Sequence, residues 1–404
     1  SKSHLFQERR IDYMEWKTAW SYLPLDYGTT IGTVENITQK TIFRNNINGK
    51  RVKVKFTNLY GNTPLKLKEV VIAQRKYGQS GITGSVNVTV DNQQEIIILP
   101  GQEFYSDEII YNIKAGTDIV LSVYIEEAAE IQSSCCSWAK QSWYTTYVLG
   151  GNYTKIEDIN GAKSYEVYPF IKTYMDNADV IAGISEVRLL TEEDVKVITL
   201  FGDSITHMSF YSDALIEDLY KRFPGKVTVL NKGLGGNKLL TDASYFPDIP
   251  GNGRSSGQAA IRRFERDVFL TETPDFIFVL EGVNDLMHPY LLKKEDLLPT
   301  KQEMIEAYMK LVSIAHKNGS KIYLSTILPL VHQRTPFGAE GEKIRNEINK
   351  WILKQKESDG VFDFASALAK NSQSMKDELH IGDGLHPNKE GGIVMANVVL
   401  QNRR

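Results

Sequence analysis

The chain has 404 residues, of which 42% are hydrophobic and 24% are charged, and its formal net charge is −3. This length allows two domains, each with a full hydrophobic core. The near-neutral charge and the lack of a basic tail argue against nucleic acid as a partner. No uninterrupted apolar run reaches the ~18–20 residues of a membrane span, so none is expected.

The N-terminal ten residues contain no apolar segment of the kind that a secretory signal peptide carries. The only two cysteines are the neighbours Cys135 and Cys136. We expect them to be free thiols in a reducing compartment, because a disulfide between adjacent residues is strained, and two cysteines cannot build a four-thiolate zinc site. These features favour a cytoplasmic location. Secretion stays an alternative, since a start at Ser1 is compatible with a removed signal.

Strand-like runs separated by turns fill the chain up to about residue 190. Residues 51–56 alternate charged and apolar side chains, as a half-buried strand does. The dipeptide Asn48-Gly49 before them predicts a hairpin turn. Further strands are expected at 70–73, 86–90, 95–99 and 118–125. Many short strands with few helical patterns predict an all-β, jelly-roll-like sandwich over residues 1–190.

From residue 191 to 404 strands alternate with helices. Strands are expected at 195–201, 227–230, 276–280 and 321–326, and helices at 211–220, 304–316 and 340–356. This alternation predicts a parallel sheet covered by helices on both faces. The boundary between the two domains is expected between residues 176 and 194.

The segment Gly202-Asp203-Ser204-Ile205-Thr206 follows the apolar strand at 195–201. It places Ser204 at the C-terminal end of a strand, where open α/β sheets bind ligands. A serine hydroxyl needs a base to become a good nucleophile, and the base works best when a third group orients it. Asp383-Gly384-Leu385-His386 carries both partners. A Gly-Asp-Ser turn or an Asp-x-x-His alone is a common structural pattern, but together they predict a Ser-His-Asp triad.

Two further segments can supply hydrogen-bond donors to an oxyanion. Residues 231–237, Asn-Lys-Gly-Leu-Gly-Gly-Asn, follow a predicted strand and match neither common nucleotide-binding glycine pattern. Residues 281–285, Glu-Gly-Val-Asn-Asp, follow the next strand and offer a side-chain amide. With the backbone N–H of Ser204, a glycine N–H and this amide would form an oxyanion hole.

In this order the four segments resemble the four blocks of the SGNH (GDSL) hydrolase superfamily, over about residues 194–404. The resemblance implies a flavodoxin-like, three-layer α/β/α domain and a serine esterase without metal or cofactor. It assigns Ser204 as nucleophile, His386 as base and Asp383 as its orienting group. It assigns the oxyanion hole to Ser204, Gly236 and Asn284. Residues 41–44, 49–58 and 104–107 resemble a β-region that precedes this domain in a bacterial subset.

Three polar residues near these blocks are candidates for substrate binding: His207, Glu281 and His288. Many relatives with the N-terminal region carry Asp-Gly where this chain has His207-Met208. For both histidines the alternative is a solvated loop side chain. His380 lies close to His386 in the chain, but we do not expect it to be the base.

Other polar and aromatic residues are given structural interpretations. Asp203 and Asp285 are expected to hold loops through turn-type hydrogen bonds. Arg345 and Asn349, four residues apart on a predicted helix, are expected to form a surface pair. The cluster of Trp138, Trp143, Tyr144 and Tyr147 is interpreted as core packing rather than as a platform for sugars.

The expected activity is hydrolysis of carboxylic esters, with a short acyl group such as acetyl on a carbohydrate or small molecule. This expectation rests on analogy with modular enzymes that join a β-sandwich to this hydrolase. One alternative is a lipolytic esterase or thioesterase for longer acyl chains, against which the lack of a long apolar lid argues. The other is a carbohydrate-binding protein with an inactive hydrolase domain, against which the complete set of site residues argues. No oligomeric state is predicted.

Overall fold

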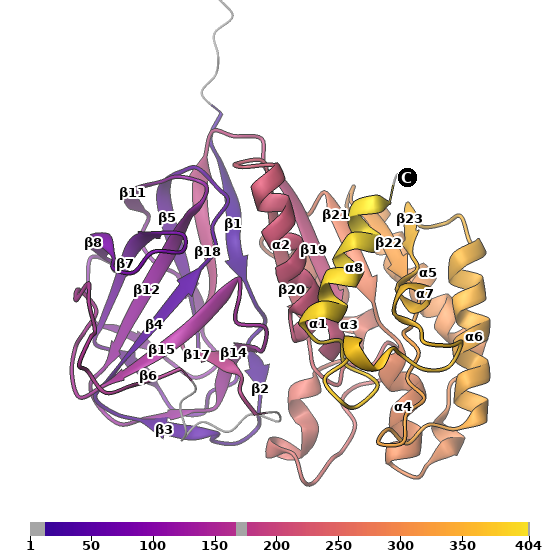
Figure 1. Ribbon diagram of the computed structural model, residues 1–404. Coiled ribbons are helices and arrows are strands. Elements are labelled where there is room, and N and C mark those ends of the chain that lie inside the picture. Colours follow the sequence, from indigo (N-terminus) through magenta and orange to yellow (C-terminus); the bar gives the residue numbers. More distant parts are fainter. Residues whose placement is uncertain (1–12, 167–175, 403–404) are drawn as a thin grey trace, which may run out of the picture.

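The computed structural model describes residues 13–166 and 176–402, and a β-rich half lies beside a half that contains the helices (Figure 1). The first half has two main antiparallel sheets. One contains β1 (Glu15–Ser21), β18 (Ile184–Thr191), β5 (Gly49–Thr57) and β10 (Glu103–Tyr105) in that order, with β11 (Ile109–Ile113) also on β5. The other runs β16 (Ser164–Tyr165), β15 (Trp143–Leu149), β4 (Ile37–Phe43), β12 (Thr117–Ile125), β7 (Glu69–Lys76) and β8 (Thr83–Asn87).

Shorter strands complete this half in three small sheets. They are β2 (Leu25–Asp26), β14 (Ser133–Ser137) and β17 (Asp179–Ile181), then β3 (Gly32–Val34) with β13 (Ala129–Ile131), and β6 (Leu65–Leu67) with β9 (Ile96–Ile98).

One hydrophobic core joins the two main sheets. On β5 the side chains of Val52, Val54 and Phe56 are fully buried, while the charged residues between them are not, which is the expected period of two. Leu121 and Val123 of β12 belong to the same core cluster. The prediction of an N-terminal β-sandwich is therefore confirmed.

The hairpin predicted at Asn48-Gly49 is wrong. Strand β4 before this dipeptide pairs with β12 and β15, whereas β5 after it pairs with β18, β10 and β11 in the other sheet. The connection is fixed instead by Asn46, whose side-chain amide donates to the carbonyls of Phe223 and Val227 at 3.0 and 2.8 Å. The chain therefore crosses from one sheet to the other here.

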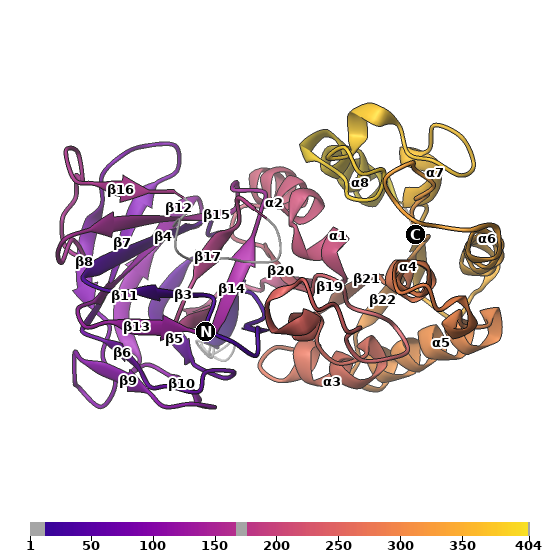
Figure 2. The ribbon, with the colours of Figure 1, turned by 90° about the horizontal axis from the view of Figure 1, so that it is seen from below.

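The second half contains a parallel sheet of five strands. Their order is β20 (Val227–Gly233), β19 (Lys196–Gly202), β21 (Phe276–Leu280), β22 (Lys321–Ser325) and β23 (Gly360–Phe362). In chain order this is 2-1-3-4-5, the flavodoxin-like arrangement, in which ligands bind at the carboxyl ends of the strands. Figure 2 shows α2 and α8 on one face of the sheet and α3 and α5 on the other. The predicted three-layer α/β/α architecture is confirmed.

The helices of this half are α1 (Ser204–His207), α2 (Phe210–Arg222), α3 (Ala260–Phe269), α4 (Val283–Leu291), α5 (Lys301–Lys317), α6 (Ala339–Lys354), α7 (Phe364–Leu368) and α8 (Lys389–Gln401), with 3-10 turns at Pro250–Ser256, Glu295–Leu297 and Asp377–Leu379. Helix α5 begins at a capping box in which Thr300 and Glu303 exchange side-chain-to-backbone hydrogen bonds. None of the helices in the described ranges combines the length and the hydropathy that crossing a bilayer requires.

Arg345 and Asn349 of α6 do not form the surface pair that was predicted. Arg345 is only 2% exposed, and its guanidinium donates to the Glu342 carboxylate and to the carbonyls of Ile327 and Ser372. Asn349 is also buried and exchanges hydrogen bonds with the backbone of Ile327. A four-residue spacing predicts that two residues share one face of a helix, but it does not predict whether that face is exposed or buried. Here the shared face is buried.

Polar side chains tie the two halves of the chain together. The Asp213 carboxylate of α2 accepts hydrogen bonds from the Ser142 N–H at 2.9 Å and the Ser142 hydroxyl at 2.5 Å. The Ser209 hydroxyl lies 2.7 Å from the Tyr22 hydroxyl. Asp213 and Ser209 are both buried, so these bonds hold the start of α2 against the β-sandwich.

Buried aromatic rings and thiols also lie on this side of the sandwich. Trp143 and Tyr147 are at most 2% exposed, and Trp143 packs edge-on against Trp20 at 5.4 Å. Core packing is thus the role of these rings. Cys135 and Cys136 of β14 are free and fully buried, and burial raises the pKa of both thiols.

Candidate active site

Ser204, His386 and Asp383 form one chain of hydrogen bonds. Strand β19 ends at Gly202, and Ser204 is the first residue of α1, so its side chain lies at the carboxyl edge of the sheet. The Ser204 hydroxyl lies 2.8 Å from Nε2 of His386. Nδ1 of the same ring lies 2.5 Å from a carboxylate oxygen of Asp383. Residues 182 positions apart in sequence therefore meet in the order that a hydroxyl, a base and an orienting carboxylate require.

A tight loop holds Asp383 and His386 in place. One Asp383 oxygen accepts the backbone N–H groups of Leu385 and His386 at 2.9 and 3.0 Å, which leaves the other oxygen for the imidazole. Burial alone would raise the pKa of Asp383. The hydrogen bond from His386, the charge of this ring when it is protonated, and these two N–H groups instead hold the pKa well below its ordinary value. Nδ1 of His380 accepts the N–H groups of Gly382 and Gly384, so His380 supports this loop.

The glycine segment and Asn284 surround the serine with donors. Gly236 has φ of +78°, and a Cβ on it would lie 2.3 Å from the Ser256 hydroxyl, so only glycine fits. No hydrogen bond of its N–H occurs within the described part of the chain. The Asn284 amide donates one N–H to the Asn237 carbonyl at 2.9 Å, which fixes the amide and leaves its second N–H. The N–H of Ser204 starts a helix and has no intrahelical acceptor.

Three carboxyl groups are buried beneath the serine. Asp203 accepts the N–H of Ile205, and Asp285 accepts those of Leu239 and Leu240, so both hold loops as predicted. Burial is the main cause that raises the pKa of Asp203 to about 7 and that of Asp285 to about 6. Burial and the nearby Asp203 raise the pKa of Glu281 well above its ordinary value, although Arg263 opposes this.

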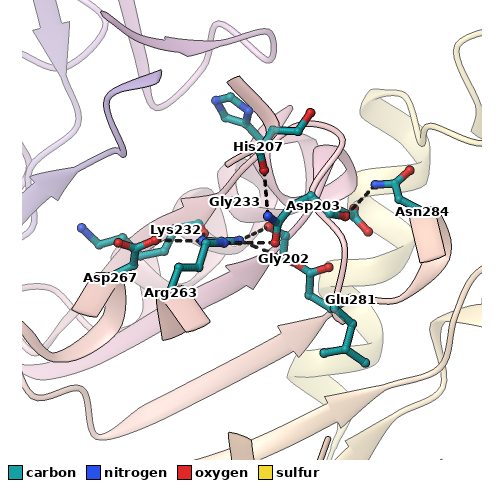
Figure 3. Close-up of polar contacts among 12 residues, drawn as sticks. Gly202, Asp203, His207, Lys232, Gly233, Arg263, Asp267, Glu281 and Asn284 are labelled. Atoms are coloured by element: carbon teal, nitrogen blue, oxygen red, sulfur yellow. Dashed lines mark hydrogen bonds and ion pairs between the residues drawn. The ribbon is translucent and has the colours of Figure 1, made fainter. Parts of the chain in front are cut away.

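Arg263 is a site residue that sequence reasoning missed. It is fully buried and donates to the carbonyls of Gly202 and Lys232 at 2.9 and 3.0 Å and to the Asn237 side chain at 3.0 Å. Figure 3 shows its guanidinium at the centre of these contacts, beneath the strand ends that precede Ser204. Its neighbours on α3 are mostly charged, so the pattern indicates a solvent-facing position, and no local motif distinguishes it.

His207 does not flank an open cleft. It is 1% exposed, and Trp138 of the β-sandwich packs edge-on against its ring at 5.1 Å. Its Nδ1 lies 3.0 Å from the Gly235 N–H and its Nε2 lies 3.0 Å from the Cys136 carbonyl. The acceptor role of Nδ1 requires the proton on Nε2, so the ring is neutral and links the sandwich to the glycine segment. The prediction of a substrate-binding or solvated histidine is wrong, because the β-sandwich covers this side chain.

Glu281 and His288 are also buried away from solvent. The Glu281 carboxylate lies 3.4 Å from the Arg263 guanidinium, and both side chains are fully buried, so it is not a substrate-binding group. His288 is 4% exposed, its Nδ1 lies 2.9 Å from the Ser244 hydroxyl, and Phe246 packs against its ring. Sequence placed both residues near the site but could not show that side chains from the 244–246 loop and from α3 cover them.

Comparisons with known proteins identify the family of the second half. Residues 200–392 match the model of the GDSL-like Lipase/Acylhydrolase family. No curated protein is detectably similar in sequence to the chain.

Similar solved structures include LAE5, an alpha/beta hydrolase from the metagenome of Lake Arreo, with 21% identity over 51% of this chain and 93% of that one, at a TM-score of 0.40. A putative acylhydrolase from Bacteroides fragilis is 20% identical over 51% of this chain and 85% of that one, at a TM-score of 0.37. A single-residue variant of Axe2, an acetyl xylan esterase from Geobacillus stearothermophilus, is 19% identical over 52% of this chain and 96% of that one, at a TM-score of 0.39. Residues 200–392 thus form a GDSL-like lipase/acylhydrolase domain, which makes this chain an ester-hydrolysing enzyme.

Proposed function

We propose that this protein is a serine esterase that uses Ser204, His386 and Asp383 as a catalytic triad. The observation that carries the proposal is the continuous hydrogen-bond chain from the Ser204 hydroxyl through both ring nitrogens of His386 to Asp383. With Asp383 bound to Nδ1–H, the lone pair of Nε2 faces the hydroxyl. The imidazole is thereby set to accept the serine proton.

In the proposed reaction the Ser204 oxygen attacks the ester carbonyl while Nε2 of His386 takes its proton. The tetrahedral intermediate collapses, His386 protonates the leaving alcohol, and an acyl-enzyme remains. Water then attacks the acyl-enzyme with His386 again as base, which releases the acid and restores the serine. Asp383 orients the ring and stabilises the imidazolium that forms in each half-reaction.

We assign the oxyanion hole to the N–H groups of Ser204 and Gly236 and to the free N–H of the Asn284 amide. These donors come from the ends of three neighbouring strands. Gly236 is held by its close approach to Ser256, and Asn284 is held by its bond to Asn237. Donors fixed in advance stabilise developing charge without a reorganisation cost.

The acyl group is proposed to be short, with acetyl esters of carbohydrates or small molecules as the substrates. Two cavities among the described residues, of about 660 and 560 Å³, are lined by neither Ser204 nor His386. An acyl chain of many carbons needs an apolar cavity that opens beside the nucleophile. What supports a short acyl group is the analogy with modular enzymes that join a β-sandwich to this hydrolase and act on decorated sugars.

The test is hydrolysis of p-nitrophenyl esters from acetate to decanoate, followed by acetylated oligosaccharides. Activity that falls steeply beyond short acyl groups, with acetate release from the oligosaccharides, supports the proposal. A preference for long chains would move the assignment to a lipolytic esterase or thioesterase. No turnover of any ester would favour the binding-protein alternative.

Replacing Asn284 by alanine is expected to lower kcat by about 10²–10³ with little change in KM, because the amide is proposed to act mainly on the charged intermediate. Steady-state kinetics with p-nitrophenyl acetate measure this. Asn318→Ala, at the C-terminal end of α5, is the matched control and should keep wild-type kinetics. A rise in KM at unchanged kcat would show instead that Asn284 binds the ground state.

We propose that His207 is a positioning residue for Gly236, since it accepts the N–H of the preceding Gly235. His207→Phe removes both hydrogen bonds of the ring, and we expect kcat to fall by about 10–100-fold at nearly constant KM. His207→Gln can still accept from Gly235 and donate to Cys136, so it should restore most of kcat. A folded phenylalanine variant with wild-type kcat would contradict this role.

The stability that His207 contributes is expected to decrease in acid. Burial, with a smaller effect of Arg263, lowers the pKa of His207 to about 4 from 6.5, and the bond to the Cys136 carbonyl only partly opposes this. The unfolded chain therefore binds a proton at a higher pH than the folded chain, so this contribution is complete above pH 6.5 and is lost as the pH falls toward 4. Urea unfolding of wild type and His207→Gln should show their difference in free energy shrinking over this range. A constant difference would contradict the buried, neutral ring.

A further inference from the structure

A cavity of about 660 Å³ lies between the two halves of the chain. From the β-sandwich it is lined by Ser21 at the end of β1, by residues 22–24 and by Lys55. From the hydrolase half it is lined by Lys232 and residues 242–245. Its volume is in the range of ordinary small-molecule sites. Because Ser204 and His386 do not line it, this cavity is separate from the proposed catalytic centre.

The carboxylates that line the cavity are already paired with cations. The pairs are Asp26 with Arg254 at 2.8 Å, Asp242 with Arg262 at 2.6 Å, Asp267 with Arg266 at 2.9 Å, Glu186 with Arg188 at 3.5 Å and Glu103 with Lys55 at 3.9 Å. Three of the four lining cations, Lys55, Arg254 and Arg266, are accounted for in this way. The fourth is Lys232.

Lys232 is a buried cation without a carboxylate partner. It is 8% exposed, and none of the carboxylates in the described ranges lies within 4.0 Å of its ammonium. Of its three N–H donors, one reaches the Ser21 hydroxyl at 2.5 Å, and Ser21 also lines the cavity. Figure 3 shows the Lys232 side chain extending to the side opposite Asn284. An ammonium in such surroundings is costly until an anion pairs with it.

The carboxylates nearest to Lys232 do not pair with its ammonium. Burial lowers the pKa of Lys232, while the more distant Glu186 and Asp267 oppose this. Both of those carboxylates are held by other groups, Glu186 by Tyr105 and Thr271 and Asp267 by Arg263. They cannot move to the ammonium without leaving these buried partners. An anionic partner for this ammonium would therefore come from outside the described part of the chain.

We propose that this cavity binds a ligand that carries a carboxylate, and that Lys232 supplies the cation that pairs with it. Among the described lining residues, the Lys232 ammonium is the one charged group without an oppositely charged partner. A ligand carboxylate would pair with it, whereas a neutral ligand would leave it unpaired. Ser244 and Gln258 line the same cavity and offer hydrogen bonds to hydroxyl groups, as in an acidic sugar. The inference does not depend on the esterase activity.

The position of the cavity gives its ligand contact with the glycine segment. Leu234 and Gly257 line the cavity, and they are chain neighbours of Gly235 and Ser256, which surround Gly236. A bound ligand would thus lie next to the loop that holds the proposed oxyanion donor.

The experiment is ligand-observed NMR titration of the Ser204→Ala protein with sodium D-glucuronate, D-glucose and sodium acetate, each to about 20 mM. The full chain is used with and without Lys232→Met. Lys226→Met, an exposed lysine just before β20 that pairs with Glu193, is the matched control. Thermal unfolding checks that each variant is folded, and Lys232→Gln replaces the methionine variant if that variant is not. Because binding is measured in a protein without the nucleophile, the result is independent of the proposed function.

We expect glucuronate to bind and glucose not to bind. Lys232→Met should lower the affinity for glucuronate by about tenfold or more, while Lys226→Met should leave this affinity unchanged. Acetate binding as well as glucuronate would assign the site to small carboxylic acids in general. Glucuronate binding without acetate would assign it to acidic sugars. Equal binding of glucose and glucuronate, unchanged binding to Lys232→Met, or no binding of any probe would each overturn the proposal.

Discussion

Replacing Ser204 by alanine is expected to lower kcat for p-nitrophenyl acetate by about 10⁵-fold or more, because the acyl-enzyme can no longer form. The fold should persist. Ser204 Oγ makes its hydrogen bond to His386 at the edge of the sheet, and the core of the domain lies beneath it. Steady-state kinetics give the loss of activity, and thermal unfolding gives the stability.

Ser320→Ala is the matched control for this variant. Ser320 is also buried, donates to the Pro274 carbonyl at 2.6 Å, and lies at the opposite, amino-terminal edge of the parallel sheet. It should keep kcat within about twofold of wild type even if some stability is lost. A Ser204→Ala enzyme that retained wild-type turnover would exclude the proposed mechanism.

Asp383→Asn should lower kcat by about 10⁴-fold, and the reason is the tautomer of His386. The N–H groups of Leu385 and His386 need an acceptor, which an amide N–H₂ cannot be. The asparagine oxygen is therefore expected to take the place of the Asp383 oxygen that accepts them. The amide N–H₂ would then face Nδ1 of His386. Nδ1 becomes an acceptor, the proton moves to Nε2, and the ring can no longer take the proton of Ser204.

Asp377→Asn controls for the loss of a carboxylate from the same region of the chain. Asp377 is exposed, pairs with Lys370 and lies 3.8 Å from Nε2 of His380. His380 holds the loop through its other ring nitrogen, so this replacement should leave kcat within about twofold of wild type. An Asp383→Asn enzyme with the same small effect would show that Asp383 does not orient the base. The expected pattern is a loss in kcat at nearly unchanged KM.

Much of the fold could be predicted because its signals are local. Alternation in 51–56 identified a half-buried strand, and the strand and helix alternation after residue 190 identified the parallel sheet. The Asn48-Gly49 prediction failed because turn chemistry is local but the choice of sheet is not. Contacts of Asn46 with the hydrolase half, about 180 residues later in the chain, decide that the chain crosses over.

In the proposed site, too, some residues could be predicted from local sequence and others could not. Residues that are proposed to touch the substrate lie in short motifs at strand ends, so sequence brought Ser204, Asn284 and His386 forward as candidates. Residues that hold those motifs do not share a pattern with them. Arg263 lies on a helix among charged neighbours. His207 is covered by Cys136 of β14 and by Trp138, which follows that strand. Burial by a distant part of the chain cannot be predicted from residues near the motif.

The measurement that tests the central claim most directly is covalent labelling with diethyl p-nitrophenyl phosphate, followed by peptide mass spectrometry. The account predicts one diethylphosphoryl group, attached to Ser204, with esterase activity lost in proportion to labelling and no label in Ser204→Ala. A label on another residue that tracks the loss of activity, or full activity in protein labelled at Ser204, would contradict it.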